Sequence, residues 1–509
     1  MTAFITWLNE IIWSPVLVYL CLAVGVYFTI RTRLLQIRQI PSMLRATFKG
    51  ESSQDGVSSF QALALSLAGR VGTGNIAGVA TAIAFGGPGA VFWMWAVAFL
   101  GSATSFIEST LGQIYKERDK VTGEYRGGPA YYFEKAYRHT KYSGLFKVYV
   151  SLFACATVLA CGFFLPGVQA NGIATSMQGA FPQIHPWMTA TGITILLAFI
   201  VVGGVKRIAA FASVVVPIMA VIYIILAVIV CFINIGMLGD VVNLIFSSAF
   251  GLHATFGAIV GTAVEWGVKR GIYSNEAGQG TGPHAAAAAE VKHPASQGFV
   301  QAMAVYIDTL FVCSATAFLI LSTGMYRVYQ GGSADTPVLA EGSGTLDPEA
   351  TVGPAFAQSA FDTLLPGAGT IFIAVSLGFF AFTTIIAYYY MAETNLRYLT
   401  RNLKNETVSN GLLRLLQLLI LVATVVGCVN SAGEAWALGD IGVGLMAWLN
   451  VVGILVIQKP ALQALRDYEQ QRKQGQDPLF DPRALDIRNA DFWENYYDVK
   501  TGAIPVQKK

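Results

Sequence analysis

Long apolar stretches alternate with short polar connections along most of the 509-residue chain. A bilayer core about 30 Å thick is crossed by roughly 20 apolar residues in an α-helix. Eleven stretches approach or reach that length, including two that contain clustered glycines and polar residues. The pattern predicts helices at residues 12–31, 60–86, 89–113, 145–169, 188–204, 208–235, 253–290, 299–325, 367–391, 411–428 and 435–457.

Composition supports this class. Hydrophobic residues make up 54% of the chain and charged residues only 12%, about half of the roughly 25% found in soluble domains. We therefore expect an all-α polytopic protein embedded in a lipid bilayer. Nucleic acid is not an expected partner, and no segment points to a protein partner.

Lysine and arginine are distributed unevenly among the connections. Residues 31–49 and 116–141 are rich in both, whereas 171–187 and 236–252 contain neither, and the longest connection, 326–366, has one Arg against five acidic residues. Basic connections stay in the cytoplasm. Eleven helices with the N-terminus outside and the C-terminus in the cytoplasm satisfy this rule at each connection.

The helix order also predicts an internal repeat. Setting aside the first helix leaves ten, and two sets of five must cross the membrane in opposite orientations. We expect an extra helix with a basic cytoplasmic loop at 1–59, an inverted repeat of helices 2–6 at 60–235, a second repeat of helices 7–11 at 252–457, and a cytoplasmic tail at 458–509. The tail is mostly mixed-charge, which favours a solvated segment; docking through the aromatics of "DFWENYYDV" is the alternative.

The first helix of each repeat is interrupted. The breaks read "GRVGTGNIAG" at 69–78 and "RGIYSNEAGQGTGPHAAAAAE" at 270–290. Matching breaks in the two halves are the best sequence indication of a transport site. The exposed N–H groups of a half-helix attract an anion and its exposed carbonyls attract a cation. Tight packing through the GxxxG step of Gly74 and Gly78 is the alternative explanation, but it does not require Arg70, Thr73 and Asn75.

Three segments resemble the alanine or glycine:cation symporter family, the sodium:alanine symporters. They are "FQALALSLAGRVGTGNIAGVATAIAFGGPGAVFWMW" at 60–95, "RGGPAYYF" at 126–133 and "RGIYSNEAGQGTGPHAAAAAEVKHPASQGFVQ" at 270–301. The resemblance covers roughly residues 12–457. It implies Na⁺-coupled uptake of a small neutral amino acid, most often alanine or glycine, by alternating access, and the five-plus-five inverted-repeat fold of neurotransmitter:sodium symporters.

The same resemblance implies positions for substrate and ion. The N–H groups of Thr73 and Gly74 are expected to face the substrate carboxylate, with Asn75 bracing the break or touching substrate. A sodium ion is expected among oxygens of Ala68, Val71, Phe380, Thr383 and Thr384, because the last three share one helix face. The alternative for the two threonines is a hydrogen bond back to their own helix.

Other polar residues are expected to line the cavity. In the second break they are Asn275, Gly278, Gln279 and Gly280. On the helix at 145–169, Gln169 lies near the outer end, and nearby Asn171 either lines the pocket or caps a helix.

Several charged residues fall within or near the predicted helices, where an unpaired charge is costly. We expect Arg70, Lys269 and Arg270 to pair with Glu276, Asp308 or Glu108, as a gate or as a static clamp. We expect His284 to be packed or hydrogen-bonded rather than a proton carrier.

Other functions are alternatives to sodium-coupled uptake of alanine or glycine. Proton coupling through the buried carboxylates and His284 is an alternative to sodium, and glutamine or serine is an alternative substrate. No HExxH motif, metal-ligand cluster or Ser-His-Asp arrangement lies in the predicted helices, so we do not expect an enzyme. A channel would conduct ions without amino acid. The expected location is a bacterial plasma membrane, the inner membrane in a Gram-negative cell.

Overall fold

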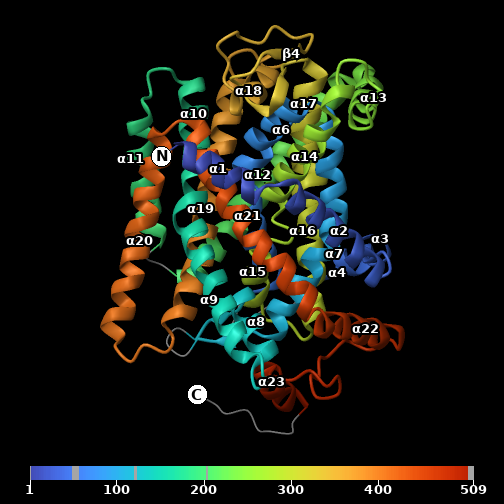
Figure 1. The fold of residues 1–509 in the computed structure, drawn as a ribbon, viewed down its shortest axis with the longest axis vertical. Coiled ribbons are helices and arrows are strands. Elements are labelled where there is room, and N and C mark those ends of the chain that lie inside the picture. Colours follow the sequence, from blue (N-terminus) through green and yellow to red (C-terminus); the bar gives the residue numbers. More distant parts are fainter. Residues whose placement is uncertain (1, 49–56, 120–122, 202–203, 502–509) are drawn as a thin grey trace.

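The computed structural model describes residues 2–48, 57–119, 123–201 and 204–501. Most of its helices run along the long axis of the molecule, and shorter elements gather at the two ends (Figure 1). Among the described residues, eight helical stretches are long and apolar enough to cross a membrane: Phe4–Arg31, Gly89–Ile114, Ser143–Ala180, Ala210–Val230, Pro294–Thr323, Gly369–Thr400, Glu406–Val429 and Ala432–Ile457. The predicted class, an all-α polytopic membrane protein, is confirmed.

The three other predicted spans are shorter or interrupted. Residues 188–204 correspond to α11 (Pro186–Val201), one of the shorter apolar helices. Residues 60–86 are divided into α5 (Ser59–Arg70), η1 (Gly74–Gly78) and α6 (Val79–Gly86). Residues 253–290 contain η4 (Gly257–Ile259), α14 (Val260–Asn275) and α15 (Gly282–Ala288). Both predicted breaks are therefore present as interruptions of helical geometry.

The remaining helices overlap the predicted ranges, apart from α1 (Thr2–Ile12), which ends where the first predicted range, 12–31, begins. They are α1 (Thr2–Ile12), α2 (Pro15–Arg31), α7 (Gly89–Ile114), α9 (Ser143–Leu159), η2 (Ala160–Phe164), α10 (Leu165–Ala180), α12 (Gly204–Ile233), α16 (Pro294–Val305), η5 (Tyr306–Cys313), α17 (Ser314–Thr323), α19 (Gly369–Thr400), α20 (Glu406–Val429) and α21 (Ala432–Ile457). Pro15 separates α1 from α2, since proline is tolerated in the first turn of a helix but not in its interior.

Short elements cover the ends. One end carries η3 (Ile235–Met237), α13 (Leu238–Ala249), α17, β3 (Arg327–Tyr329), η6 (Gln330–Gly332), β4 (Val338–Glu341) and α18 (Pro354–Asp362). Toward the other lie α3 (Leu35–Arg38), α4 (Ile40–Phe48), β1 (Glu117–Arg118), β2 (Tyr125–Arg126), α8 (Pro129–Tyr137), α22 (Lys459–Lys473) and α23 (Asp491–Thr501). Each strand pair is antiparallel, β1 with β2 and β3 with β4. Lys49 and residues 120–122 of the predicted basic connections lie outside the described residues.

One predicted connection contains a helix, and the expectation of a solvated tail is corrected. The connection 236–252 contains α13, which buries Val241, Ile245 and Ala249 on one face. The tail is not simply solvated: Phe480 and Trp493 are fully buried. Both segments carry apolar or aromatic residues at helical spacing, and those residues are stabilised by burial.

Two groups of helices meet around the breaks. In the first, α7 packs against α14, α15 and α16. In the second, α10 packs against α19, α20 and α11. The helix α5 contacts members of both groups, α16 and α19. This arrangement places the first break between the two groups.

Candidate functional site

The first break is braced by one asparagine. The helix α5 ends at Arg70, and π-helical geometry begins at Gly74. The Asn75 side chain accepts a hydrogen bond from the Gly72 N–H at 2.8 Å and donates one to Asp308 Oδ1 at 2.7 Å. Asn75 therefore holds the break open and ties it to η5.

The five residues expected to bind sodium lie in one cluster. The Thr384 hydroxyl lies 2.8 Å from the Ala68 carbonyl, 3.3 Å from that of Val71 and 2.9 Å from that of Phe380. The Thr383 hydroxyl donates to the Phe380 carbonyl at 2.9 Å, three residues back on its own helix, which is the alternative arrangement for this threonine. Three carbonyl oxygens thus share the protons of two hydroxyls, so the cluster has surplus acceptor capacity. Such an all-oxygen set suits a hard cation.

The expected carboxylate position is occupied by a side-chain amide. Thr73 N–H donates to Gln169 Oε1 at 2.9 Å, and Gln169 Nε2 donates to the Tyr273 hydroxyl at 3.4 Å. An amide oxygen accepts a hydrogen bond as a carboxylate oxygen does. Gln169 and Thr73 are buried, and Thr73 Oγ1 has no hydrogen-bond partner among the described residues.

Gly72 lies between the ion cluster and Gln169. A Cβ at Gly72 would lie 2.6 Å from Thr384 Oγ1 and 2.7 Å from Gln169 Oε1. At Gly74, a Cβ would lie 3.3 Å from the Ser274 Cα. Glycine at these positions allows the two breaks and α19 to approach closely.

The second break is satisfied partly by a carboxylate of α7 and partly by its own groups. Gly278 and Gly280 donate their N–H groups to Glu108 at 3.2 and 3.1 Å, and Gln279 donates to the Ile272 carbonyl at 2.8 Å. Asn275 Oδ1 accepts from Ala277 N–H at 3.0 Å, while its Nδ2 has no partner among the described residues. The structure does not bring Gly278, Gln279 or Gly280 into hydrogen-bonding contact with the first break.

Asn171 and His284 have structural partners. Asn171 donates to the carbonyls of Gly427 and Asn430 at 3.1 and 2.9 Å, so it caps the end of α20. The buried His284 ring contacts the Thr281 carbonyl and the Asn395 amide at 3.0 and 2.8 Å.

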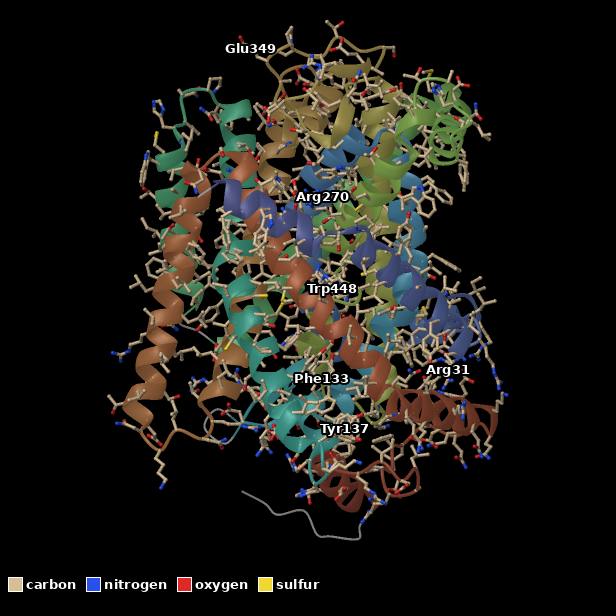
Figure 2. The ribbon with its side chains drawn as sticks, in the orientation of Figure 1. Arg31, Phe133, Tyr137, Arg270, Glu349 and Trp448 are labelled. Atoms are coloured by element: carbon tan, nitrogen blue, oxygen red, sulfur yellow. The ribbon has the colours of Figure 1, made fainter. Side chains whose placement is uncertain are left out.

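The expected partners of Lys269 and Arg270 were wrong. Arg270 forms a bidentate ion pair with Asp440 at 2.7 and 3.1 Å, and Lys269 reaches the same carboxylate at 2.9 Å. The Arg270 guanidinium lies 4.2 Å from the Trp436 ring centre, and Trp13 donates to the Asp440 carbonyl at 2.7 Å. This group, the Asp440 cluster, lies in the half of the molecule that carries α13 and β4 (Figure 2). Asp440 could not be identified as a partner from the sequence, because nothing local shows that it lies on α21 beside Lys269 and Arg270 of α14.

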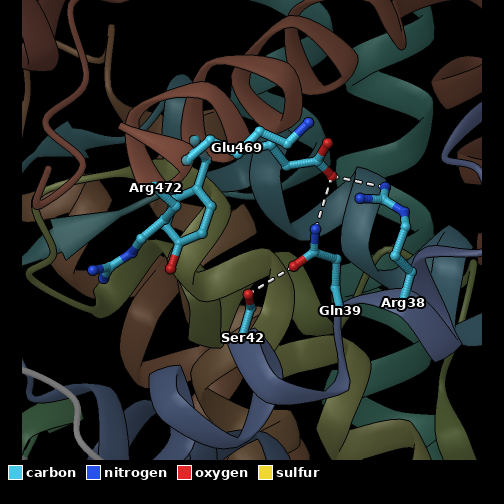
Figure 3. A pocket seen from close by; sticks show the side chains of 7 residues that line it. Arg38, Gln39, Ser42, Glu469 and Arg472 are labelled. Carbon is cyan, nitrogen blue, oxygen red and sulfur yellow. Dashed lines mark hydrogen bonds and ion pairs between the residues drawn. The ribbon is translucent and has the colours of Figure 1, made fainter. Parts of the chain in front are cut away.

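A polar pocket lies away from these residues. It is lined by Arg38, Gln39, Ser42, Tyr468, Glu469, Arg472 and Lys473 (Figure 3). Arg38 and Gln39 contact Glu469 at 2.7 and 3.0 Å. The pocket therefore marks where α22 of the tail is tied to the segment before α4, and none of the residues predicted to bind substrate or ion lines it.

The family model and the relatives of known name point to the same family. The model of the sodium:alanine symporter family matches residues 1–482. A candidate sodium/proton-dependent alanine carrier of Bacillus subtilis (strain 168) is 56% identical over 98% of both chains. A sodium/proton-dependent alanine carrier of Bacillus sp. (strain PS3) is 49% identical over 89% of this chain and 98% of its own. A candidate sodium/glutamine symporter of Bacillus subtilis (strain 168) is 40% identical over 93% of this chain and 91% of its own.

The family match covers nearly the whole chain, and it agrees with the broken helices and the oxygen cluster described above. The chain belongs to the sodium:alanine symporter family.

Proposed function

We propose that the protein is a sodium-coupled symporter that takes up alanine, and glycine as a second substrate, across a bacterial plasma membrane. The observation that carries this proposal is the oxygen cluster of Ala68, Val71, Phe380, Thr383 and Thr384 beside the first break. Family membership and the alanine carriers among the relatives support the substrate and the ion.

In this proposal the substrate carboxylate binds at the break. Gln169 releases the Thr73 N–H, and the N–H groups of Thr73 and Gly74 then face the carboxylate, as anions favour helix N-termini. Asn75 keeps the break open, and Asn275 Nδ2 is the second-break group free to reach the substrate. Close packing at Gly72 and Gly74 leaves little room, which favours a small side chain.

Gly72 provides the coupling between ion and substrate. Sodium among the oxygens of Thr384 and Val71 would fix the backbone that also presents Thr73 N–H. Sodium then raises substrate affinity, and substrate raises sodium affinity by the same factor. One Na⁺ entering across 100 mV releases about 2.3 kcal/mol, which drives uptake.

Alternating access would proceed by rocking of the α7–α14–α16 group, together with α5, against the α10–α19 group. This division is based on the inverted repeat of 60–235 and 252–457 in an eleven-helix topology. The end that carries α8, α22 and α23 is proposed to be cytoplasmic, and the N-terminus external, because the basic connections gather near that end.

Glutamine is the second candidate substrate, since a relative at 40% identity is a candidate sodium/glutamine symporter. Alanine is favoured because the alanine carriers are 56% and 49% identical. Two relatives also bear the name of sodium/proton-dependent carriers, so a proton is a candidate second coupling ion.

The test is uptake of labelled alanine into liposomes that contain the purified protein. We expect uptake with an inward Na⁺ gradient and little when K⁺ replaces Na⁺. Competition with excess glycine should inhibit strongly, and competition with glutamine weakly. Uptake of equal rate in K⁺ would contradict sodium coupling, and stronger competition by glutamine would reassign the substrate.

A further inference from the structure

A row of polar side chains lies between α7 and α16. Ser105, Ser109 and Gln113 are spaced by four residues on α7, and Gln297 and Gln301 have the same spacing on α16. Residues four apart share one helix face, and these two helices pack against each other. All five side chains are fully buried. We call these five residues the polar seam.

Several atoms of the seam have no hydrogen-bond partner among the described residues. They are Ser109 Oγ, Gln113 Oε1, Gln301 Nε2 and both polar atoms of the Gln297 amide. Buried polar groups are nearly always satisfied, and where no protein group is available the partner is ordered water. The seam therefore carries unpaired polar atoms on both helices to which water can hydrogen-bond.

Arg70 lies at the inner end of the seam. Its guanidinium donates to the Gln301 carbonyl at 3.1 Å and to Ser105 Oγ at 3.3 Å, while Nε has no partner among the described residues. A Cβ at Gly282 would lie 2.8 Å from Arg70 Nη2 and 3.5 Å from Ser109 Oγ. At the other end, the backbone carbonyl of Gln113 accepts a hydrogen bond from the Trp493 indole N–H. The seam thus runs from the first break to the tail.

Three buried carboxyl groups lie within electrostatic range of this one guanidinium: Glu276, Asp308 and Glu108. Glu108 accepts hydrogen bonds from Gly278, Gly280 and Asn450, at 3.2, 3.1 and 2.6 Å. Asp308 accepts them from Asn75, Ser274 and Thr309, at 2.7, 3.0 and 2.7 Å. Three donors can solvate a buried carboxylate, so both of these groups can hold a negative charge.

Glu276 differs from the other two. It is fully buried, and neither of its carboxyl oxygens accepts a well-aligned hydrogen bond from a described residue; the Thr281 hydroxyl, which also lacks such a bond, is the polar side chain close enough to act on it. The oxygens face the backbone of α5, since a Cβ at Gly69 would lie 3.4 and 3.5 Å from them. The polar and titratable groups around it are Arg70, Asp308, Thr281, Tyr273, Tyr388 and Cys161. No described group forms an ion pair with it within 4 Å, and an unsolvated buried carboxylate is highly unfavourable.

We propose that Glu276 is a proton-binding site and that it exchanges its proton with the tail end of the molecule through the polar seam. The protonated, neutral carboxyl is the form compatible with the conformation described here. On deprotonation the proton passes to water in the seam, and the carboxylate can pair with the free Nε of Arg70. This inference rests on the proposed function and deepens it, because it gives the candidate second coupling ion a site and a route.

Proton release would also act on the first break. Gly69 and Arg70 adjoin Ala68 and Val71, whose carbonyls belong to the proposed sodium site. An Arg70 side chain drawn toward Glu276 would leave Ser105 and Gln301, and the α5 backbone would move with it. Protonation of Glu276 and sodium binding are then coupled through four consecutive residues.

The test compares wild type with Glu276→Gln, because glutamine has the shape and neutrality of protonated glutamate. Alanine uptake and alanine-induced proton flux, followed with a pH-sensitive dye inside liposomes, are measured with an inward Na⁺ gradient between pH 6 and pH 9. In the wild type we expect proton flux and uptake that varies with pH. In Glu276→Gln we expect Na⁺-dependent uptake to persist, proton flux to fall at least tenfold, and the pH dependence to flatten.

Two further variants test the polar seam as the proton route and control for nonspecific effects of substituting a glutamate. Ser109→Ala combined with Gln301→Leu should slow the proton flux with Glu276 intact. Glu349→Gln, an exposed glutamate near β4, should behave as wild type. Wild-type proton flux in Glu276→Gln would overturn the proposal, and so would loss of uptake at every pH by a folded Glu276→Gln protein.

If Glu276→Gln does not fold, infrared spectroscopy of the wild-type protein decides the question. A carboxylic acid C=O band that disappears as pH rises supports the proposal, provided that Glu276→Asp shifts it. Absence of such a band across the range overturns it. Loss of Na⁺ dependence in the wild type would instead count against the proposed function, and is measured separately by uptake of radioactive sodium.

Discussion

At the scale of single residues, Thr384 makes the sharpest prediction. Its hydroxyl is within 3.3 Å of three carbonyl oxygens from two helices. Thr384→Val keeps the shape of the side chain and removes one oxygen of the proposed sodium site. We expect the Na⁺ concentration for half-maximal alanine uptake to rise at least tenfold, which corresponds to about 1.4 kcal/mol.

The control for this change is Thr394→Val on the same helix. Its buried hydroxyl bonds back to the Tyr390 carbonyl at 2.9 Å, so no break carbonyl depends on it. Its Na⁺ dependence should match wild type. Equal effects of the two substitutions would remove Thr384 from the sodium site.

Gly72 supports a second residue-scale prediction. In Gly72→Ala the added methyl group would lie 2.6 Å from Thr384 Oγ1 and 2.7 Å from Gln169 Oε1, so both must shift. Overpacking of this kind costs about 1–3 kcal/mol. We expect uptake to fall more than tenfold through both alanine and Na⁺ affinity, measured as initial rates at varied concentrations. Gly192→Ala on α11, where nothing lies within 4 Å of the added methyl, should be neutral.

The sequence singled out these residues as candidates because their pattern is local, and the structure brings them together. Glycines 69, 72 and 74 mark a break, and Thr383 with Thr384 marks a helix face, within a few positions of chain. Asp440 could not be found in this way, since its partner Arg270 is 170 residues away in the sequence. The surrounding stretch "WALGDIGVG" also has no local feature that marks the aspartate as a member of an ion pair. The αL conformation of Glu276 (φ 58°) was likewise not predictable, because glycine is the residue usually found there.

At the scale of elements, the Asp440 cluster joins α14 to α21. One buried carboxylate compensates two cations, Lys269 and Arg270. In Asp440→Asn both cations lose their counter-charge, and removing one partner of a buried pair typically destabilises by about 3–5 kcal/mol. We expect a clear fall in the thermal unfolding midpoint of the purified protein in detergent, measured by intrinsic fluorescence.

Two comparison variants test this explanation. Glu434→Gln removes an exposed carboxylate in the first turn of the same helix and should leave the midpoint unchanged. Adding Lys269→Gln to Asp440→Asn removes one uncompensated cation and should restore part of the loss. A midpoint for Asp440→Asn equal to that of Glu434→Gln would show that the cluster is not a structural link.

At the scale of the whole molecule, the tail joins segments that are distant in sequence. The Trp493 indole donates to the Gln113 carbonyl at 2.7 Å, and the Phe480 N–H donates to the Lys292 carbonyl at 3.1 Å. Asp491 forms an ion pair with Arg138 at 3.0 Å. The tail thus connects the end of α7, the segment before α16, and α8. Composition alone favoured a solvated tail, because averaging over 458–509 hides a few buried aromatics.

Trp493 is the anchor of this contact, as it is fully buried. Trp493→Ala removes an aromatic side chain from a packed site, which typically costs about 3–5 kcal/mol. We expect the tail to become accessible to limited proteolysis after Arg483 and Arg488, with the membrane helices intact by circular dichroism. Tyr142→Ala, an exposed aromatic, is the matched control. Unchanged protection in Trp493→Ala would place the anchor elsewhere.

Docking of the tail should also depend on pH through Lys116. Burial lowers the pKa of Lys116 from its ordinary value of 10.5 to about 7; its Nζ lies 4.4 Å from the Phe492 ring centre and 2.7 Å from the Ala289 carbonyl. An undocked tail leaves this lysine in water with an ordinary pKa. Between about pH 7 and 10.5 the undocked state therefore binds more protons, so docking tightens as pH rises across that window.

Hydrogen exchange of the peptide around Trp493, corrected for the intrinsic pH dependence of exchange, measures this effect. Protection should increase from pH 7 to pH 9 in the wild type. In Lys116→Met it should be constant, because no charge is buried on docking and Gln113 Nε2 still donates to the Ala289 carbonyl at 2.9 Å. Protection that falls with rising pH, or that rises equally in Lys116→Met, would mean that another group controls the docking. If Lys116 does control it, the pH on the side of the membrane that carries the tail acts on the end of α7, where the polar seam also ends.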